Sequence, residues 1–227
     1  MNLKELAAQG ALDYVNSGMC LGLGTGSTAT YFIEMLAERI RCGDLRDLQA
    51  VPTSNHTASL ANSLGIPLTS LSKHPELDLA VDGADEVDSS LNLIKGLGQA
   101  LLREKIVETH ARRLIIIVDE SKIVPRLGSH RPLPVEIVQF EAAVQVSWLN
   151  SLGCRAELWL EDGKPVVTDN GNYLARCWFQ GGITDPYALA RKLEGRPGIV
   201  EHGLFMDMAS RVVVAGNEGL RIMERGK

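Results

Sequence analysis

The first residues that could carry chemistry form a glycine-rich loop, Gly22-Leu-Gly-Thr-Gly-Ser-Thr28, between a short apolar run and a helical pattern. Glycines let backbone N–H groups converge, and a helix N-terminus adds partial positive charge that attracts phosphate. The loop has neither the lysine of a Walker A motif nor the G-x-G-x-x-G spacing of a dinucleotide fingerprint. It predicts a phosphate site, with a simple helix cap by Ser27 or Thr28 as the alternative. A second, weaker hydroxyl-rich turn follows at 53–57, and a simple helix cap is an equal alternative there.

Acidic residues gather in the segment Val81-Asp-Gly-Ala-Asp-Glu-Val87. Asp82 and Asp85 stand at the carboxyl end of a predicted strand, where open α/β sheets bind ligands. Paired carboxylates can share a proton, and their hard oxygens also suit magnesium. An ordinary acidic turn is the alternative interpretation. The segment therefore predicts either proton-transfer chemistry or a cation site.

A lysine and two glycines open the segment Lys95-Gly-Leu-Gly-Gln-Ala-Leu-Leu-Arg-Glu-Lys105 and form a second anion-binding turn before a helix. Glu104 lies about a turn and a half into that helix, and taken alone it reads as a solvated position. Lys122 follows another predicted strand, in reach of a phosphate, although a surface lysine is the even alternative. Because all these segments follow strands of one predicted sheet, their shared position favours a common ligand site.

Hydrophobic periodicity indicates the elements that must position these residues. Strands are predicted at 19–23, 48–51, 77–81 and 114–118, and helices at 3–15, 29–40, 57–64 and 99–110. This alternation is typical of an α/β fold with a doubly wound, mostly parallel, Rossmann-like sheet.

The pattern changes after Pro125, where Pro132 and Pro134 interrupt the chain. The predicted elements there are a helix at 142–152, a strand at 155–160, hairpin turns at Asp162-Gly163 and Asn170-Gly171, a helix at Pro186 capped by Asp185, and strands near 200 and at 212–214. We expect residues 1–130 plus 204–227 to form a Rossmann-like catalytic domain and residues 131–203 a small α+β domain. The last strand is expected to return to the first domain.

Composition excludes several classes of protein. The chain has 227 residues, 45% of them hydrophobic, and a net charge of −5, so it can bury a core and offers no basic face for nucleic acid. No apolar run approaches the length of a membrane span, and the N-terminus lacks a secretory signal. We therefore expect a cytoplasmic protein without nucleic-acid or membrane partners.

Cysteine and histidine spacing gives no metal signal. The four cysteines form no C-x-x-C pair, and the five histidines show no H-x-H or H-E-x-x-H spacing. We expect reduced thiols, and no metal site built from histidines and cysteines.

The motifs together resemble those of type A ribose-5-phosphate isomerases. The matching stretches are Gly-Leu-Gly-Thr-Gly-Ser-Thr, Asp-Gly-Ala-Asp-Glu, Lys-Gly-x-Gly with Arg-Glu-Lys-Ile, Asp-Glu-Ser-Lys, Leu-Pro-Val-Glu, Val-Thr-Asp-Asn-Gly-Asn and Pro-Gly-Ile-Val-Glu-His-Gly-Leu-Phe. They occur in the order seen in that family, and the resemblance covers about residues 3–220.

The resemblance implies cofactor-free interconversion of ribose 5-phosphate and ribulose 5-phosphate in the non-oxidative pentose phosphate pathway. It makes Glu104 the base that moves a proton between C2 and C1, with Asp82, Asp85 and Lys95 around the enediolate oxygens. The implied substrate-binding residues are Thr25, Gly26, Ser27, Thr28, Asp82, Gly83, Ala84, Asp85, Lys95, Gly96, Leu97, Gly98 and Lys122. A homodimer or homotetramer is expected.

One turn departs from the family pattern, which is commonly Lys-Gly-Gly-Gly-Ala-Ala. Leu97 and Gln99 replace glycine and alanine here, and Leu97 would be strained if its position needed a positive φ.

Two other functions are compatible with parts of this pattern. A sugar-phosphate sensor of the repressor type would need a DNA-binding module, and too few residues precede the first predicted strand for one. An amino-sugar phosphate deaminase shares the Thr-Gly-Ser-Thr loop, but Asp-Gly-Ala-Asp with Arg-Glu-Lys-Ile argues against it.

Overall fold

The computed structural model describes residues 2–225, which fall into two compact units. The first unit comprises Met1–Ala84, Arg103–Lys122 and Asp207–Lys227, and the second comprises Asp85–Leu102 and Ile123–Met206. The domain boundaries expected from the sequence stay a prediction. The two compact units group the residues differently, with the 85–102 segment in the second unit.

A six-stranded sheet forms the centre of the first unit, in the order β15-β14-β6-β3-β1-β2. Its strands are β1 (Cys20–Leu23), β2 (Gln49–Pro52), β3 (Leu79–Asp82), β6 (Leu114–Asp119), β14 (Arg211–Gly216) and β15 (Gly219–Glu224). All neighbouring pairs are parallel except β14 with β15. The predicted mostly parallel sheet is confirmed, as is the return of the 212–214 segment to it.

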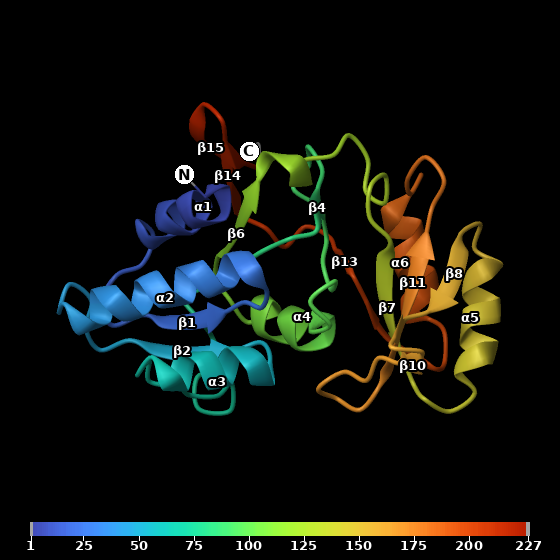
Figure 1. Ribbon diagram of the computed structural model, residues 1–227, viewed down its shortest axis with the longest axis horizontal. Helices are drawn as coiled ribbons and strands as arrows, with labels where there is room; N and C mark the ends of the chain where they lie inside the picture. Colours follow the sequence, from blue (N-terminus) through green and yellow to red (C-terminus); the bar gives the residue numbers. More distant parts are fainter. Residues whose placement is uncertain (1, 226–227) are drawn as a thin grey trace. The chain divides into compact units, whose positions relative to one another are not determined.

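Helices cover both faces of this sheet because its strands are apolar on both sides. The helices are α1 (Leu3–Leu12), α2 (Ser27–Arg41), α3 (Asn55–Ser63) and α4 (Leu101–Thr109). On β1, Leu21 and Leu23 pack in the cluster that contains Phe32 of α2. Cys20 instead packs in the cluster with Val107 of α4. Alternate residues of β1 thus pack against helices on opposite faces of the sheet. Helices α1 and α2 lie side by side (Figure 1).

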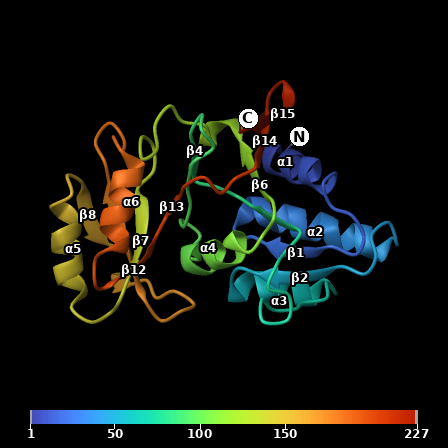
Figure 2. The same cartoon turned by 180° about the vertical axis from the view of Figure 1, so that it is seen from behind.

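The second unit is built on antiparallel pairs. Its four-stranded sheet has the order β12-β7-β11-β8 and its three-stranded sheet the order β13-β5-β4. The elements are β4 (Glu86–Val87), β5 (Leu93–Ile94), β7 (Leu133–Ile137), α5 (Ala142–Asn150), β8 (Arg155–Leu158), β9 (Leu160–Glu161), β10 (Lys164–Pro165), β11 (Tyr173–Trp178), α6 (Pro186–Glu194), β12 (Ile199–His202) and β13 (Leu204–Phe205). Both α5 and α6 contribute to the apolar cluster of the four-stranded sheet (Figure 2).

Strand β7 was not expected, because prolines usually interrupt central strands. All five of its residues are buried. Pro134 pairs with Arg176 of β11, and its carbonyl accepts a hydrogen bond from Gly203 N at 2.8 Å. Gly203 lies just beyond the end of β12. The hydrogen bonds between β12 and β7 therefore continue through the Pro134 carbonyl, although proline has no N–H to donate.

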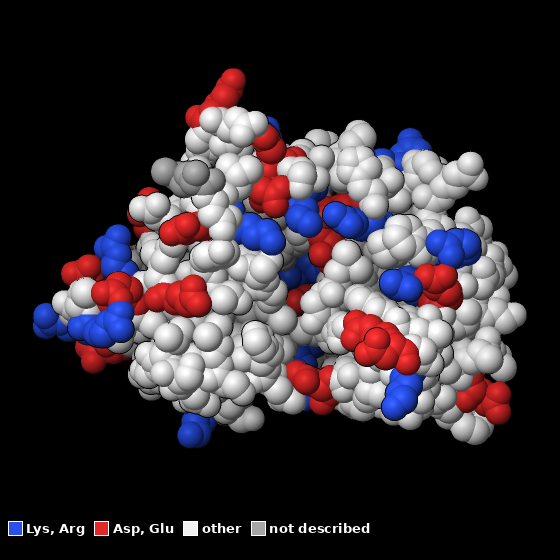
Figure 3. Space-filling view, in the orientation of Figure 1, with Lys and Arg blue, Asp and Glu red and all other residues white. Residues whose placement is uncertain are grey.

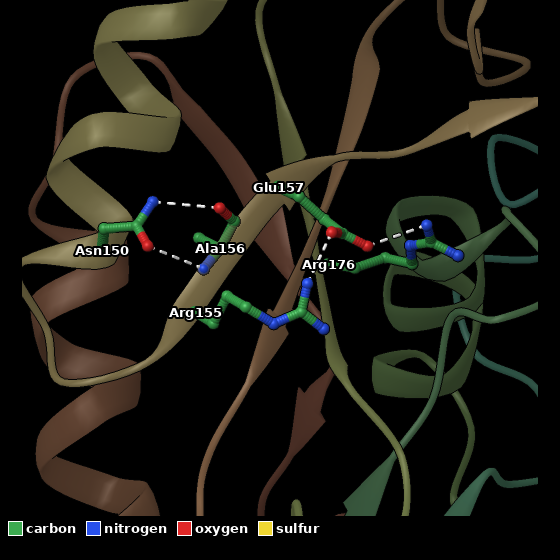
Figure 4. Close-up of polar contacts among 5 residues, drawn as sticks. All are labelled: Asn150, Arg155, Ala156, Glu157 and Arg176. Carbon is green, nitrogen blue, oxygen red and sulfur yellow. Dashed lines mark hydrogen bonds and ion pairs between the residues drawn. The ribbon is translucent and has the colours of Figure 1, made fainter. Parts of the chain in front are cut away.

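Polar contacts fasten α5 to β8 and β8 to β11 (Figure 4). The Asn150 side chain donates to the Ala156 carbonyl and accepts from the Ala156 amide, both at 3.0 Å. Glu157 on β8 accepts from Arg155 at 2.7 Å and from Arg176 on β11 at 2.9 Å. An amide side chain that bonds both backbone groups of one residue fixes where the helix meets the strand.

Local turn chemistry follows the sequence at several places. Asp162 and Gly163 have φ of 50° and 75° between the paired strands β9 and β10, as the hairpin prediction requires. Asp185 caps α6 by accepting a hydrogen bond from Ala188 N at 2.9 Å. Gly171 also has a positive φ, 77°, in the second predicted turn.

Charged side chains of both signs are interspersed on the face in Figure 3. Within residues 2–225, no helix is long and apolar enough to cross a membrane. The same residues contain no group of three or more histidine, cysteine or acidic side chains that could hold a metal. All four cysteines are free thiols.

Candidate active site

The glycine-rich loop leaves the N-terminus of α2 open. Gly26 is the N-cap residue, with φ of 109°, and no side chain caps the helix. The alternative that Ser27 or Thr28 is a simple cap is therefore wrong. A positive φ of this size favours glycine, because it has no Cβ. The first amides of α2 are left to bind an anion.

Asp82 binds the glycine-rich loop through its side chain. Its Oδ1 accepts hydrogen bonds from Thr25 N at 3.0 Å and from Gly83 N at 2.6 Å. Asp82 is only 1% exposed. Gly24 lies against it so closely that an added Cβ would overlap the Asp82 carboxyl group. The end of β3 and the loop after β1 are thus packed and hydrogen-bonded to each other.

Replacing Gly24 by alanine is expected to displace Asp82. We expect kcat/KM to fall at least roughly tenfold and the free energy of unfolding to fall by about 1–3 kcal/mol, the usual cost of overpacking. Steady-state kinetics with ribose 5-phosphate, the substrate that the resemblance implies, and urea unfolding would measure the two effects. Gly195→Ala is the matched control, because its nearest atom is an ordinary 3.4 Å away. Native kinetics in Gly24→Ala would contradict the tight fit.

The Thr25 hydroxyl has a structural role. Its Oγ1 lies 2.7 Å from Thr53 Oγ1, 2.9 Å from Ser54 Oγ and 3.1 Å from Thr57 Oγ1. Ser54 also caps α3 by accepting from Thr57 N at 3.0 Å. The weaker hydroxyl-rich turn at 53–57 is therefore a cap that joins the loops after β1 and β2. The Thr25 side chain thus joins these loops, while its backbone N–H binds Asp82.

Lys4 is a candidate that the sequence did not single out. Its Nζ donates to Ser27 Oγ at 2.8 Å. This contact places an ammonium group beside the open N-terminus of α2. A lone lysine in the first turn of a helix belongs to no motif, so only the packing of α1 beside α2 reveals it.

Lys122 ends the short 3₁₀ helix η1 (Glu120–Lys122), which directly follows β6. It is half-buried. Asp119 stabilises this turn by accepting from Ser121 N at 3.0 Å. Since β6 pairs with β3 in parallel, Asp82 at the end of β3 and Lys122 shortly after β6 lie at the same edge of the sheet.

Glu104 lies in the first turn of α4 and is only 2% exposed. The alternative of a solvated helix position is therefore wrong. Arg103 donates to Asn55 Oδ1 at 2.8 Å and ties α4 to the start of α3. A buried carboxylate on an anchored helix is expensive to maintain unless it has partners or a function.

In the second unit, Asp85 organises the lysine–glycine turn. Its Oδ2 accepts a hydrogen bond from Leu97 N at 2.9 Å, and its own N–H donates to Ile94 O at 2.8 Å. Lys95 is 2% exposed, and Gly96 has φ of 108°. Asp85, Lys95 and the turn thus form one rigid group.

Leu97 does not carry the strain that the sequence suggested. The positive φ angles of the turn lie at Gly96 and at Gln99, whose φ is 65°. Gln99 is therefore the strained residue, and a left-handed conformation costs a non-glycine residue about 1–2 kcal/mol. Its Nε2 donates to Glu161 Oε1 of β9 at 2.7 Å, which helps to hold that conformation.

The Glu86 side chain binds backbone amides. It is 1% exposed, and its carboxylate accepts hydrogen bonds from the amides of Gly128, His130 and Arg131. A carboxylate committed to three amides anchors a loop and is poorly suited to proton transfer.

The predicted site residues thus divide between the units. The first unit holds Thr25, Gly26, Ser27, Thr28, Asp82, Gly83, Ala84, Glu104 and Lys122, and the second holds Asp85, Lys95, Gly96, Leu97 and Gly98. In the first unit, the sheet order reverses between β1 and β3, and ligands of such sheets bind outside the carboxyl ends at that point. The loops that follow these two strands are the ones joined through Asp82.

Comparison with known proteins gives one consistent result. A family model described as ribose 5-phosphate isomerase A (phosphoriboisomerase A) matches residues 49–219. Ribose-5-phosphate isomerase A of Roseiflexus castenholzii is 52% identical, over 97% of this chain and 94% of its own length. The probable ribose-5-phosphate isomerase 3, chloroplastic, of Arabidopsis thaliana is 45% identical, over 99% of this chain and 83% of its own.

Solved structures agree. The ribose 5-phosphate isomerase of Plasmodium falciparum superposes with a TM-score of 0.96 at 37% identity, covering 99% of both chains. A D-ribose-5-phosphate isomerase in complex with phospho-erythronic acid gives 0.95 at 41% identity, covering 99% of this chain and all of its own. The chain therefore belongs to the ribose 5-phosphate isomerase A family.

Proposed function

We propose that this protein interconverts D-ribose 5-phosphate and D-ribulose 5-phosphate through an enediolate, without a cofactor, in the non-oxidative pentose phosphate pathway. The observation that carries the proposal is membership of the isomerase family over nearly the whole chain. The geometry within each unit supports it, because the predicted catalytic side chains lie on a helix or on hydrogen-bonded turns that fix their positions.

Phosphate binding is proposed at the start of α2. The amides after Gly26 and the hydroxyls of Ser27 and Thr28 supply N–H and O–H donors, while Lys4 and Lys122 supply positive charge. A phosphate handle binds away from the reacting carbons, so its binding energy can be used to position C1 and C2.

Proton transfer is proposed at Glu104. Its carboxylate removes the proton from C2 of the open-chain aldose, the C–H electron pair forms the C1=C2 bond, and the C1 carbonyl oxygen becomes negatively charged. The same carboxyl group then returns the proton to C1, where the C1=C2 electron pair forms the new C–H bond. The O2–H proton moves to O1, and the electron pair left on O2 forms the ketose carbonyl at C2. Glu104 ends as it began, so no external oxidant or reductant is needed.

The two oxygens that change during this sequence also need partners. We propose that Lys95 stabilises the negative charge and that Asp82 and Asp85 pass the hydroxyl proton between O2 and O1. Backbone amides hold both aspartates, through the bonds to Thr25, Gly83 and Leu97. A fixed carboxylate loses little entropy on binding a sugar hydroxyl.

The direct test mixes the protein with ribose 5-phosphate and follows ketose formation. We expect full activity after removal of bound ions and in excess EDTA, because Lys95 stabilises charge where a metal otherwise would. Activity that disappears with EDTA and returns with magnesium would mean that Asp82 and Asp85 are metal ligands. No ketose under any of these conditions would overturn the proposed function.

We further propose that the enzyme acts in the cytoplasm as a homodimer or homotetramer. Four free thiols are typical of a reducing compartment. Phe140 is 81% exposed and Val144 on α5 is 49% exposed, and exposed apolar side chains of this kind often mark contact surfaces. Light scattering on the purified protein would test the assembly, since a mass of 24.7 kDa would mean a monomer.

A further inference from the structure

A pair of short antiparallel strands in the second unit brings Lys95 beside Phe205. Phe205 of β13 pairs with Leu93 of β5, and two residues further along Lys95 N donates to Gly203 O at 2.9 Å. Lys95 and Phe205 are therefore diagonal neighbours on one face of the pair. The Lys95 Nζ lies 5.4 Å from the centroid of the Phe205 ring, within the range of a cation–π contact.

The surrounding backbone holds this geometry. Phe205 is fully buried and Lys95 is 2% exposed. A Cβ at Gly203 would overlap the Lys95 carbonyl oxygen, so the two chains approach as closely as glycine permits. Gly203 N in turn donates to Pro134 O of β7 at 2.8 Å. The position of the ring relative to the ammonium is thus set by the sheet.

An aromatic face differs from a carboxylate as a partner for a buried ammonium. A carboxylate accepts one or more N–H groups and can take the proton. A ring face attracts the charge through its quadrupole without accepting a directed hydrogen bond. The ring therefore takes up none of the three N–H donors of the lysine.

We propose that Phe205 is a positioning residue for the isomerisation. Its ring face stabilises the Lys95 ammonium in the water-poor interior without itself taking up an N–H donor. This inference rests on the proposed function, in which Lys95 stabilises the developing negative charge. It predicts that the electron density of the ring at residue 205 affects the rate, independently of its shape.

The test introduces phenylalanine with one, two or three ring fluorines at position 205 of the full-length protein. Fluorine withdraws charge from the ring face while nearly preserving its size. We expect kcat for ribose 5-phosphate to fall with each fluorine, by about tenfold for the trifluoro ring, while KM changes little. The thermal midpoint should fall by no more than roughly 5 °C, because the ring also stabilises the ammonium in the folded protein. Phe205→Leu, which removes the ring, should lower kcat at least as much.

The matched control places the same fluorinated residues at Phe32, which is also fully buried, in the apolar core under α2. No rate trend is expected there. A flat series at position 205 in a protein that isomerises ribose 5-phosphate would overturn this inference alone, as would equal trends at both positions. Failure of the native protein to isomerise the sugar would overturn the proposed function and this inference with it.

Discussion

Replacing Glu104 by glutamine is expected to lower kcat at least about 100-fold, the low end for loss of a proton-transfer group, while KM changes little. Glutamine keeps the length of the side chain and its hydrogen-bonding reach but removes its basicity. The proton on C2 is a weak carbon acid, so its removal needs a base held within about 3 Å and shielded from water. Glu104 meets the burial requirement at 2% exposed, on a helix anchored through Arg103.

Isotope exchange sharpens this experiment. In heavy water, the protonated Glu104 carboxyl of the native enzyme should partly exchange with solvent before it returns its proton, so deuterium should enter the product. Glu104→Gln should not incorporate deuterium measurably. Glu34→Gln on the exposed side of α2 is the matched control and should keep native kinetics. If Glu104→Gln retained more than a tenth of native kcat, the base would instead be Asp82 or Asp85.

Ribose without its phosphate is expected to be used at least roughly a thousandfold less efficiently than ribose 5-phosphate, measured as kcat/KM. The estimate counts about three lost hydrogen bonds to a charged group, each contributing about 1.5–3 kcal/mol. The proposed donors are the open α2 N-terminus and the lysines beside it and after β6. Because this binding energy also positions the reacting carbons, kcat should fall as well as affinity.

A single substitution isolates one of these donors. Lys122→Met should raise KM for ribose 5-phosphate about tenfold or more, since methionine keeps the length of the side chain without its charge. Lys73→Met, at an exposed surface position, is the control and should have no effect. Equal use of ribose and its phosphate by the native protein would refute a phosphate site.

The parts of the fold that could be predicted depend on local signals. Leu114–Val118 is apolar at every position and forms the buried strand β6. Asp185 before Pro186 indicates a helix start, and Asp185 does cap α6. In both cases, neighbouring residues contain all the information that the element needs.

The features that were missed depend on distant contacts. Pro134 argues against a strand on its own, yet β7 forms because β11 and β12 flank it. The strain at Gln99 rather than Leu97 follows from how the turn closes onto Asp85. Burial of Glu104 and the contact of Lys4 with Ser27 likewise depend on packing that no short motif records.

The threading of the chain through the first unit affects how the protein is made. Strand β14 pairs with β6 and β15 and starts only at Arg211, after the 123–206 segment of the second unit. On the ribosome, the first 122 residues can therefore form at most four of the six strands. One edge of β6 stays unpaired until β14 has been synthesised. Closing the sheet needs a contact between residues about 95 positions apart, which is slow for entropic reasons. During synthesis, that exposed edge is the point most open to aggregation and to chaperone binding.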